Sequence, residues 1–320
     1  MKPKSGSKWV VVAALIGNGL IAITKMIASA ITGSSAMLSE AVHSIVDTSN
    51  QGLLLWGMKR ASKPADEQHP FGYGMELYFW TFVVAILIFA IGAGVSLYEG
   101  FSKLNHPREV RHIHINYIVL AIAMVFEGFA WTVAFREFRK RKGKLGYFKA
   151  VQVSKDPTVF TVLFEDSAAM LGLIVAFVGL LLTQALGNPM FDALASIVIG
   201  IILSCTAMLL AYESKGLLIG EAASREVVSG IRTILNKESD ILSINEILTM
   251  HMGPEDVLLN ISLDFHDNIS AGEVEKTITQ LEIEIKEKYP EVARIFIEAQ
   301  NRIAHLKNIA NGHKPAGVDA

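Results

Sequence analysis

Residues 159–186 read VFTVLFEDSAAMLGLIVAFVGLLLTQAL, an apolar run in which only Glu165 and Asp166 are charged. A helix needs about 20 apolar residues to cross a bilayer, so this run predicts a transmembrane helix. The whole chain has the same character, with 51% hydrophobic and 19% charged residues, whereas soluble domains carry about 25% charged residues. Six spans are predicted: Trp9–Ile31, Ala36–Met58, Leu77–Leu104, Ile115–Phe135, Val159–Leu186 and Met190–Leu217.

Charge and cysteine content exclude several classes of protein. The net charge of -2 gives no bulk attraction to nucleic acid, and the single cysteine, Cys205, rules out an internal disulfide framework or a cysteine-rich zinc cluster. The first apolar stretch is longer than the core of a signal peptide, which favours a retained helix. Because few residues precede it, we expect a prokaryotic inner or plasma membrane rather than an organelle.

Basic residues predict the orientation, since cytoplasmic loops of membrane proteins carry an excess of Lys and Arg. Lys59, Arg60 and Lys63 follow the second span, and the run Arg136–Lys144 follows the fourth. We therefore expect a multi-pass protein with both termini in the cytoplasm. The run Arg136–Lys144 either binds anionic lipid headgroups or acts only as a topology determinant.

The sequence after Gly220 becomes charged and periodic, as expected of a soluble domain. Helical periodicity, strand-like alternation and a helix stop at Pro290 predict the order α-β-β-α-β, a small two-layer α+β unit. Its predicted elements are Ala223–Asn236, Ile241–Met252, Val257–His266, Ser270–Tyr289 and Ala293–Ala299. We expect a transmembrane domain over residues 1–218, a cytoplasmic domain over 219–306 and a flexible tail over 307–320.

Ionisable side chains at membrane depth are costly and are functional candidates by default. Glu40, His43 and Asp47 are spaced i, i+3, i+7 and share one face of the second span. Glu165 and Asp166 offer two adjacent carboxylates on the fifth. Imidazole and carboxylate donors suit Zn²⁺, Mn²⁺ or Fe²⁺ better than Cu(I). For Lys25 or Glu127 alone, we favour a polar group paired with a neighbouring helix.

These residues lie in strings that resemble the cation diffusion facilitator family, most closely its zinc transporter nine-like branch. The strings occur in family order and the resemblance covers roughly residues 9–300. They are SEAVHSIVDTSNQ at 39–51, HPFGY at 69–73, DP at 156–157, LFEDSAA at 163–169 and GNPMFD at 187–192.

The resemblance implies a cation site with two ligands four residues apart on each of the second and fifth spans. Here His43, Asp47 and Asp166 match ligand positions, but Val162 occupies the fourth and cannot bind a metal. Glu165, Glu40 or a water is left to complete the shell, and we rank Glu165 first.

The resemblance also implies a second site in the loop after the second span, where Asp66 and His69 persist but Tyr73 replaces a histidine. A turn shaped by His69 and Pro70 is the alternative. The tail resembles a ferredoxin-like cytoplasmic module that dimerises. With only His251, His266 and Glu298 as ligand candidates in it, we favour a metal-free homodimerisation module.

The function implied is secondary active export of a divalent cation from the cytoplasm, Zn²⁺ first and Mn²⁺ or Fe²⁺ as alternatives, in exchange for protons. The metal is then substrate, and no catalytic cofactor is expected. Two other readings remain open, an intramembrane metal-dependent enzyme and a metal-gated sensor. The enzyme is disfavoured because no helical H-E-x-x-H motif is present.

Overall fold

The computed structural model describes residues 5–143, 146–147, 150–151 and 156–312. The chain divides into two compact units. A helical unit comprises Met1–Lys63 and Glu76–Lys215, and a mixed unit comprises Pro64–Met75 and Gly216–Ala320. The loop 64–75, which the sequence places between two spans, therefore groups with the C-terminal residues.

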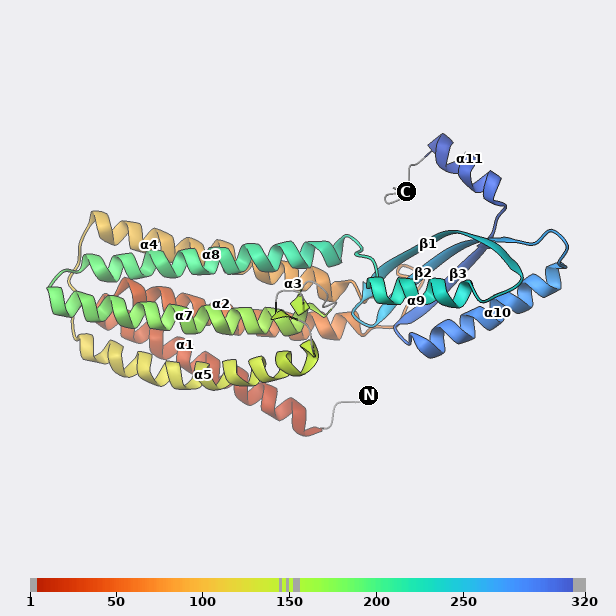
Figure 1. The fold of residues 1–320 in the computed structure, drawn as a ribbon. Coiled ribbons are helices and arrows are strands. Elements are labelled where there is room, and N and C mark those ends of the chain that lie inside the picture. Colours follow the sequence, from red (N-terminus) through yellow and green to blue (C-terminus); the bar gives the residue numbers. More distant parts are fainter. Residues whose placement is uncertain (1–4, 144–145, 148–149, 152–155, 313–320) are drawn as a thin grey trace. The chain divides into compact units, whose positions relative to one another are not determined.

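The helical unit consists of long helices that run side by side (Figure 1). Every predicted span lies on helical residues, and the third is interrupted by a π-helical segment, Ile88–Ala93, between α3 and α4. The elements are α1 (Ser5–Thr32), α2 (Ser35–Ala61), α3 (Glu76–Leu87), α4 (Gly94–Asn105), α5 (Ile113–Lys142), α7 (Pro157–Leu186) and α8 (Met190–Leu218).

Five helical runs among the described residues are long and apolar enough to cross a membrane: α1, α3 through α4, α5, α7 and α8. This supports an integral, multi-pass membrane protein. The helix α2 spans the second predicted segment but does not meet the same criterion, because its polar residues lower its mean hydropathy. The six-span arrangement is therefore a proposal that depends on α2.

The outward faces of these helices are apolar, as a lipid solvent requires. On α5, Val125 and Phe129 are 72% and 73% exposed, whereas Leu120 is fully buried. On α2 the exposed side chains include apolar ones such as Trp56, but the buried face carries Glu40, His43 and Asp47. Polar groups at this depth thus point into the helical unit, where they can meet one another.

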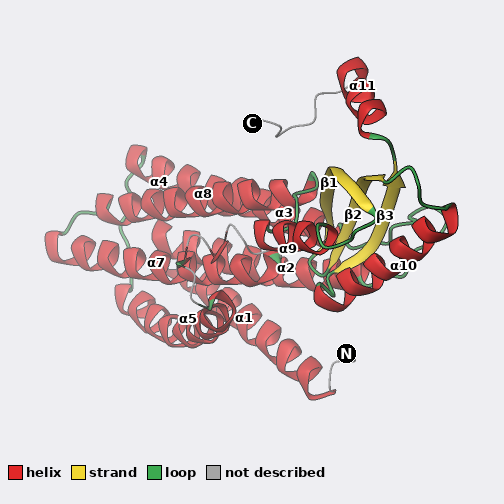
Figure 2. Cartoon of the chain, turned by 45° about the vertical axis from the view of Figure 1, so that its right-hand side comes forward, coloured by secondary structure: helices red, strands yellow, loops and turns green. Residues whose placement is uncertain are grey.

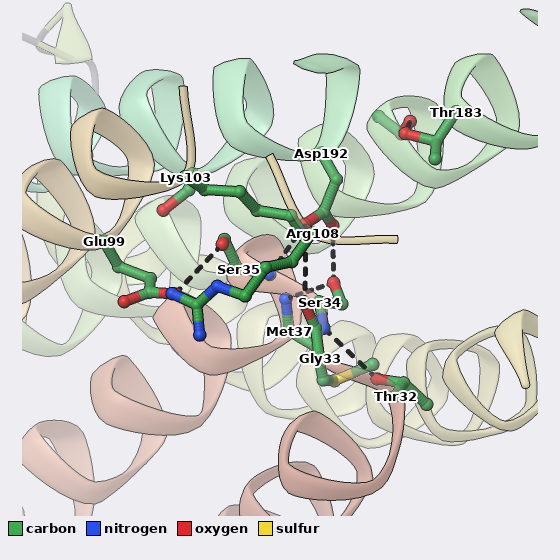
Figure 3. A network of polar contacts seen from close by, with 12 residues as sticks. Thr32, Gly33, Ser34, Ser35, Met37, Glu99, Lys103, Arg108, Thr183 and Asp192 are labelled. Atoms are coloured by element: carbon green, nitrogen blue, oxygen red, sulfur yellow. Dashed lines mark hydrogen bonds and ion pairs between the residues drawn. The ribbon is translucent and has the colours of Figure 1, made fainter. Parts of the chain in front are cut away.

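A buried ion pair joins the ends of three helices (Figure 3). The ammonium of Lys103 on α4 lies 2.7 Å from Asp192 Oδ2 on α8, with the two side chains 1% and 0% exposed. Asp192 also accepts hydrogen bonds from the Ser34 hydroxyl and the Ser35 backbone N–H, at the start of α2. A carboxylate at a helix N-terminus is stabilised by its free N–H groups.

The mixed unit has the predicted order α-β-β-α-β, and its element bounds agree with the sequence expectation to within two residues. The strands form one sheet in the order β1-β2-β3, with β1/β2 antiparallel and β2/β3 parallel (Figure 2). The elements are α9 (Arg225–Leu235), β1 (Ile241–Gly253), β2 (Asp256–Phe265), α10 (Ala271–Lys288) and β3 (Val292–Ala299).

The helices α9 and α10 pack on one face of the sheet. Alternate residues of β2, including Leu259 and Leu263, share a core with Ile231 of α9 and Leu281 of α10. The opposite face is buried at Asp264, where the Arg302 N–H donates to its carboxylate, and its open part carries Leu248 and Phe296, each more than half exposed. Beyond β3, the helix α11 (Arg302–Gly312) occupies the start of the segment expected to be a flexible tail, and residues 313–320 lie outside the described residues.

Candidate metal centre

The buried face of α2 carries donor atoms that lack partners. Ser34 caps the helix by accepting from the N–H of Met37, and three turns later His43 and Asp47 are 2% and 6% exposed. Both ring nitrogens of His43 and Oδ1 of Asp47 have no hydrogen-bond partner among the described residues. A buried polar atom without a partner is costly, so these atoms indicate a place for a ligand.

The second group of donors lies on α7. Asp156 caps this helix by accepting from the N–H of Thr158, and Pro157 occupies its first turn, where proline is favoured. Two turns further along, Glu165 and Asp166 are 2% and 5% exposed. Glu165 Oε1 accepts a hydrogen bond of 2.8 Å from Asn50 Nδ2 of α2, which joins the two ligand-bearing helices.

Asp47 is the common member of this acidic group. It interacts electrostatically with both Glu165 and Asp166, so the acidic side chains of α2 and α7 lie near one another. However, the described residues include no group of three His, Cys, Asp or Glu side chains close enough to hold an ion. The four residues ranked first from the sequence are thus on facing helices but are not gathered into a closed shell in this conformation.

Glu40, the alternative fourth ligand, has a different partner. Its Oε2 lies 3.1 Å from the ammonium of Lys25 on α1, and Lys25 also donates to the hydroxyl of Ser44 at 2.8 Å. Both charged side chains are fully buried. Gly172 of α7 approaches the other oxygen so closely that a Cβ there would lie 2.2 Å from Glu40 Oε1. Glu40 therefore joins α1, α2 and α7.

Sequence reasoning missed two partners in this region. The Asn50 amide holds Glu165, and Lys25 neutralises Glu40. Lys25 offered a signal, because it is a lone cation within an apolar span and a buried ion needs an opposite charge. Its partner could not be identified, since the rotation of α1 against α2 is not encoded in spacing along either helix.

The loop pair Asp66 and His69 is close in space but already engaged. Asp66 Oδ1 accepts from the backbone N–H groups of Gln68 and His69, and Oδ2 accepts from the Tyr73 hydroxyl at 2.6 Å. The Tyr73 hydrogen bond holds the pKa of the Asp66 carboxyl below its ordinary value. His69 Nδ1 lies 3.5 Å from Asp66 Oδ1, so a metal bound here would compete with the turn, and the auxiliary site stays a prediction.

The three candidate ligands in the mixed unit are dispersed. His251 pairs with Val257 next to the β1–β2 turn, whereas His266 follows the far end of β2. Glu298 lies opposite Ser262 on β3. His251 is buried, with Nδ1 3.2 Å from the carbonyl oxygen of Gly253. The metal-free module stays a prediction.

Comparison with known proteins identifies the family to which the chain belongs. Residues 11–219 match the cation efflux transmembrane domain family. The chain belongs to the cation diffusion facilitator family. Both helices that carry the facing donors lie within the matched region.

Three relatives illustrate the range of similarity. The human protein named proton-coupled zinc antiporter SLC30A9, mitochondrial, is 33% identical over 305 residues, which cover 94% of this chain and 53% of the relative. Metal tolerance protein C4 of Arabidopsis thaliana is 28% identical over 237 residues, or 73% of this chain and 52% of that one. The cation-efflux pump FieF of Klebsiella pneumoniae is 25% identical over 285 residues, or 89% of each chain.

The chain spans about half the length of the animal and plant relatives and most of the bacterial one. The resemblance of the strings at 39–51 and 163–169 to the zinc transporter nine-like branch is confirmed by the match to SLC30A9.

Proposed function

We propose that this protein is a secondary active transporter that exports a divalent cation, Zn²⁺ first, from the cytoplasm in exchange for protons. The observation that carries the proposal is the set of unpartnered donors on α2, His43 and Asp47, facing the carboxylates of α7. The names of the human and Klebsiella relatives, a zinc antiporter and a cation-efflux pump, support the same function.

The ion would be held by His43, Asp47 and Asp166, with Glu165 as the fourth donor. Imidazole nitrogen and carboxylate oxygen are suitable ligands for Zn²⁺. Glu165 would exchange its hydrogen bond from Asn50 for the ion, which requires only that one amide release one oxygen atom. Mn²⁺ and Fe²⁺ are the alternative substrates, because the same donor types bind them.

Proton exchange follows from competition for the same donors. A metal ion binds only deprotonated carboxylates and neutral imidazole, so binding releases protons and protonation releases the metal. In alternating access, one bundle of helices moves against another around a fixed mid-membrane site. We propose that α2 and α7 make this movement, opening the site first to the cytoplasm and then to the opposite side.

Six spans are proposed, with both termini in the cytoplasm. The helix α2 is the sixth span, although its polar residues lower its mean hydropathy. The buried polar face of α2 supports this assignment, because a helix that hides its charges inside the protein can still present an apolar surface to lipid. A prokaryotic inner or plasma membrane remains the proposed location, although the human relative's name places that protein in mitochondria.

A homodimer is proposed through the open face of the sheet. Cross-strand rows on this face bring together Leu248, Asn260 and Phe296, and Glu246, Ser262 and Glu298, around a hollow of about 370 Å³. Exposed apolar side chains on an uncovered sheet are typical of an interface. A second copy of the chain would cover the face symmetrically, as most homo-oligomers do.

Flux into proteoliposomes tests the proposed function. Purified protein is reconstituted and the uptake of Zn²⁺, Mn²⁺ and Fe²⁺ is compared with and without a pH gradient. We expect Zn²⁺ uptake to be fastest and to depend on the gradient. Because protons leave as Zn²⁺ enters, the luminal pH should rise. Metal binding without flux of any of the three ions would favour the sensor, and metal-dependent cleavage of a membrane substrate would favour the enzyme.

A further inference from the structure

Glu127 lies at membrane depth on α5, a helix outside the pair that carries the proposed ligands. Its carboxylate belongs to a buried stripe on α5 formed with Asn116, Leu120 and Ala123, and it is 6% exposed. Val125 and Phe129 on the opposite side of the helix are largely exposed to the membrane. Glu127 therefore points into the helical unit rather than toward lipid.

Other carboxylates lie near Glu127. Asp47 of α2 and Asp166 of α7 both interact with it electrostatically, and so does Glu40 of α2. The cation that acts on it is Lys25 of α1, whose ammonium is already engaged by Glu40 and Ser44. Within the described part of the chain, the Glu127 carboxylate forms no hydrogen bond and no salt bridge.

The register between α5 and α7 keeps Glu127 close to Asp166. Trp131, one turn beyond Glu127 on the same face, donates its indole N–H to the hydroxyl of Ser167 at 2.9 Å. Ser167 directly follows Asp166 in the chain. On the other side, a Cβ at Gly128 would lie 4.0 Å from the methyl group of Met170. The hydrogen bond from Trp131 to Ser167 sets the register of α5 against α7 near Glu127.

We propose that Glu127 is a ligand of the transported cation, so that the site draws its donors from three helices, α2, α5 and α7. This inference rests on the proposed function. Asp47 carries a buried oxygen without a partner, and His43, one turn away on α2, adds two nitrogens without partners. A buried carboxylate without a hydrogen bond or salt bridge is costly, and a divalent ion beside it offsets that cost. Glu127 thus adds a carboxylate from a third helix to the donors of α2 and α7.

The test uses the full chain in detergent with Zn²⁺ and Co²⁺ as probes. Zn²⁺ affinity is measured by calorimetry, and the visible absorption of bound Co²⁺ reports on the ligand atoms. Glu127→Gln removes the charge with little change in shape, and Glu127→His exchanges an oxygen donor for nitrogen. The controls are Glu137→Gln and Glu137→His, on the same helix at a half-exposed position. We expect Glu127→Gln to weaken Zn²⁺ binding at least about tenfold.

Glu127→His should also move the Co²⁺ absorption band, which a purely structural residue would not do, while both Glu137 variants should match the wild type. Unchanged Zn²⁺ affinity in Glu127→Gln and an unchanged Co²⁺ spectrum in Glu127→His would overturn the proposal. If Asp47→Asn still loses binding in that case, the proposed function stands without Glu127. A wild-type protein that binds neither ion would overturn both. Should Glu127→Gln fail to fold, the spectrum of Glu127→His decides.

Discussion

His43 is the only nitrogen donor in a proposed ligand set that otherwise consists of carboxylates. Imidazole suits Zn²⁺, whereas carboxylate oxygen suits Mn²⁺ and other harder ions. We expect His43→Asp to keep transport but to lower the ratio of Zn²⁺ to Mn²⁺ uptake by about tenfold, which corresponds to about 1.4 kcal/mol. Competition flux assays measure the ratio. A Zn²⁺ to Mn²⁺ uptake ratio equal to that of the wild type would show that His43 is not a ligand.

Lys103 and Asp192 form a buried ion pair at the end of the helices where α2 begins. Removing one partner of a buried pair leaves an uncompensated charge and costs about 3–5 kcal/mol. We expect Lys103→Met to lower the thermal unfolding midpoint strongly. The double variant Lys103→Met/Asp192→Asn should recover part of the loss, because no lone charge remains.

The recovery is the informative result for this pair. The fall in unfolding temperature of the double variant is compared with the sum of the falls in Lys103→Met and Asp192→Asn. If the two are equal, the side chains do not interact energetically, and the pair has no role in holding α2, α4 and α8 together.

At the residue scale, the sequence predicts which face of each helix carries donors but not which donors pair. The i, i+3, i+7 spacing correctly places Glu40, His43 and Asp47 on one buried face. That Glu40 is held by Lys25 depends on how α1 and α2 are rotated against each other. Pairing across helices is a tertiary property, and a single sequence contains no signal for it.

At the element scale, α4 and α8 approach each other at a glycine. A Cβ on Gly100 would lie 2.5 Å from Ile197 Cγ1 and 2.9 Å from the carbonyl oxygen of Ala193. Backbone atoms cannot give way cheaply, so Gly100→Ala should destabilise the protein by about 1–3 kcal/mol. Thermal unfolding in detergent measures the change.

Gly52 on α2 provides the matched control, since nothing lies within 4 Å of the position of its Cβ. Gly52→Ala should leave stability unchanged or raise it by up to about 1 kcal/mol, because alanine is the better helix former. Equal effects of the two substitutions would mean that α4 and α8 are not held at this contact.

The elements of the mixed unit were predictable because their signals are local. Ser270 and Glu273 form a reciprocal capping box at the start of α10, and alternation along β2 marks its buried face. The π-helical segment at Ile88–Ala93 was not predicted, since it lies in a uniformly apolar run that gives no sign of an altered turn. Likewise, α2 has a lower mean hydropathy than the other spans because of its polar residues, although it is equally helical.

At the scale of the whole molecule, the open face of the sheet predicts dimerisation. Phe296 on the edge strand β3 is 56% exposed on that face. A charge placed there would have to be desolvated in an interface, so Phe296→Asp should shift the protein from dimer to monomer. Light scattering on the full chain in detergent measures the mass.

Ile283→Asp is the control for this substitution, because Ile283 is similarly exposed, at 55%, but lies on α10, which covers the opposite face of the sheet. We expect it to leave the dimer intact. Loss of the dimer in both variants would point to a general effect of an added charge, and a persistent dimer in Phe296→Asp would exclude the open face as the interface.

The central claim is that a cation passes between α2 and α7, and proton-driven Zn²⁺ flux in proteoliposomes tests it most directly. Asp47→Asn and Asp166→Asn each keep the size of the side chain while removing a proposed ligand charge, and Glu137→Gln is the control outside the site. The account predicts that flux falls at least about a hundredfold in both aspartate variants, a loss of about 2.7 kcal/mol, and is unchanged in the control. Wild-type flux in a folded Asp47→Asn protein would contradict it.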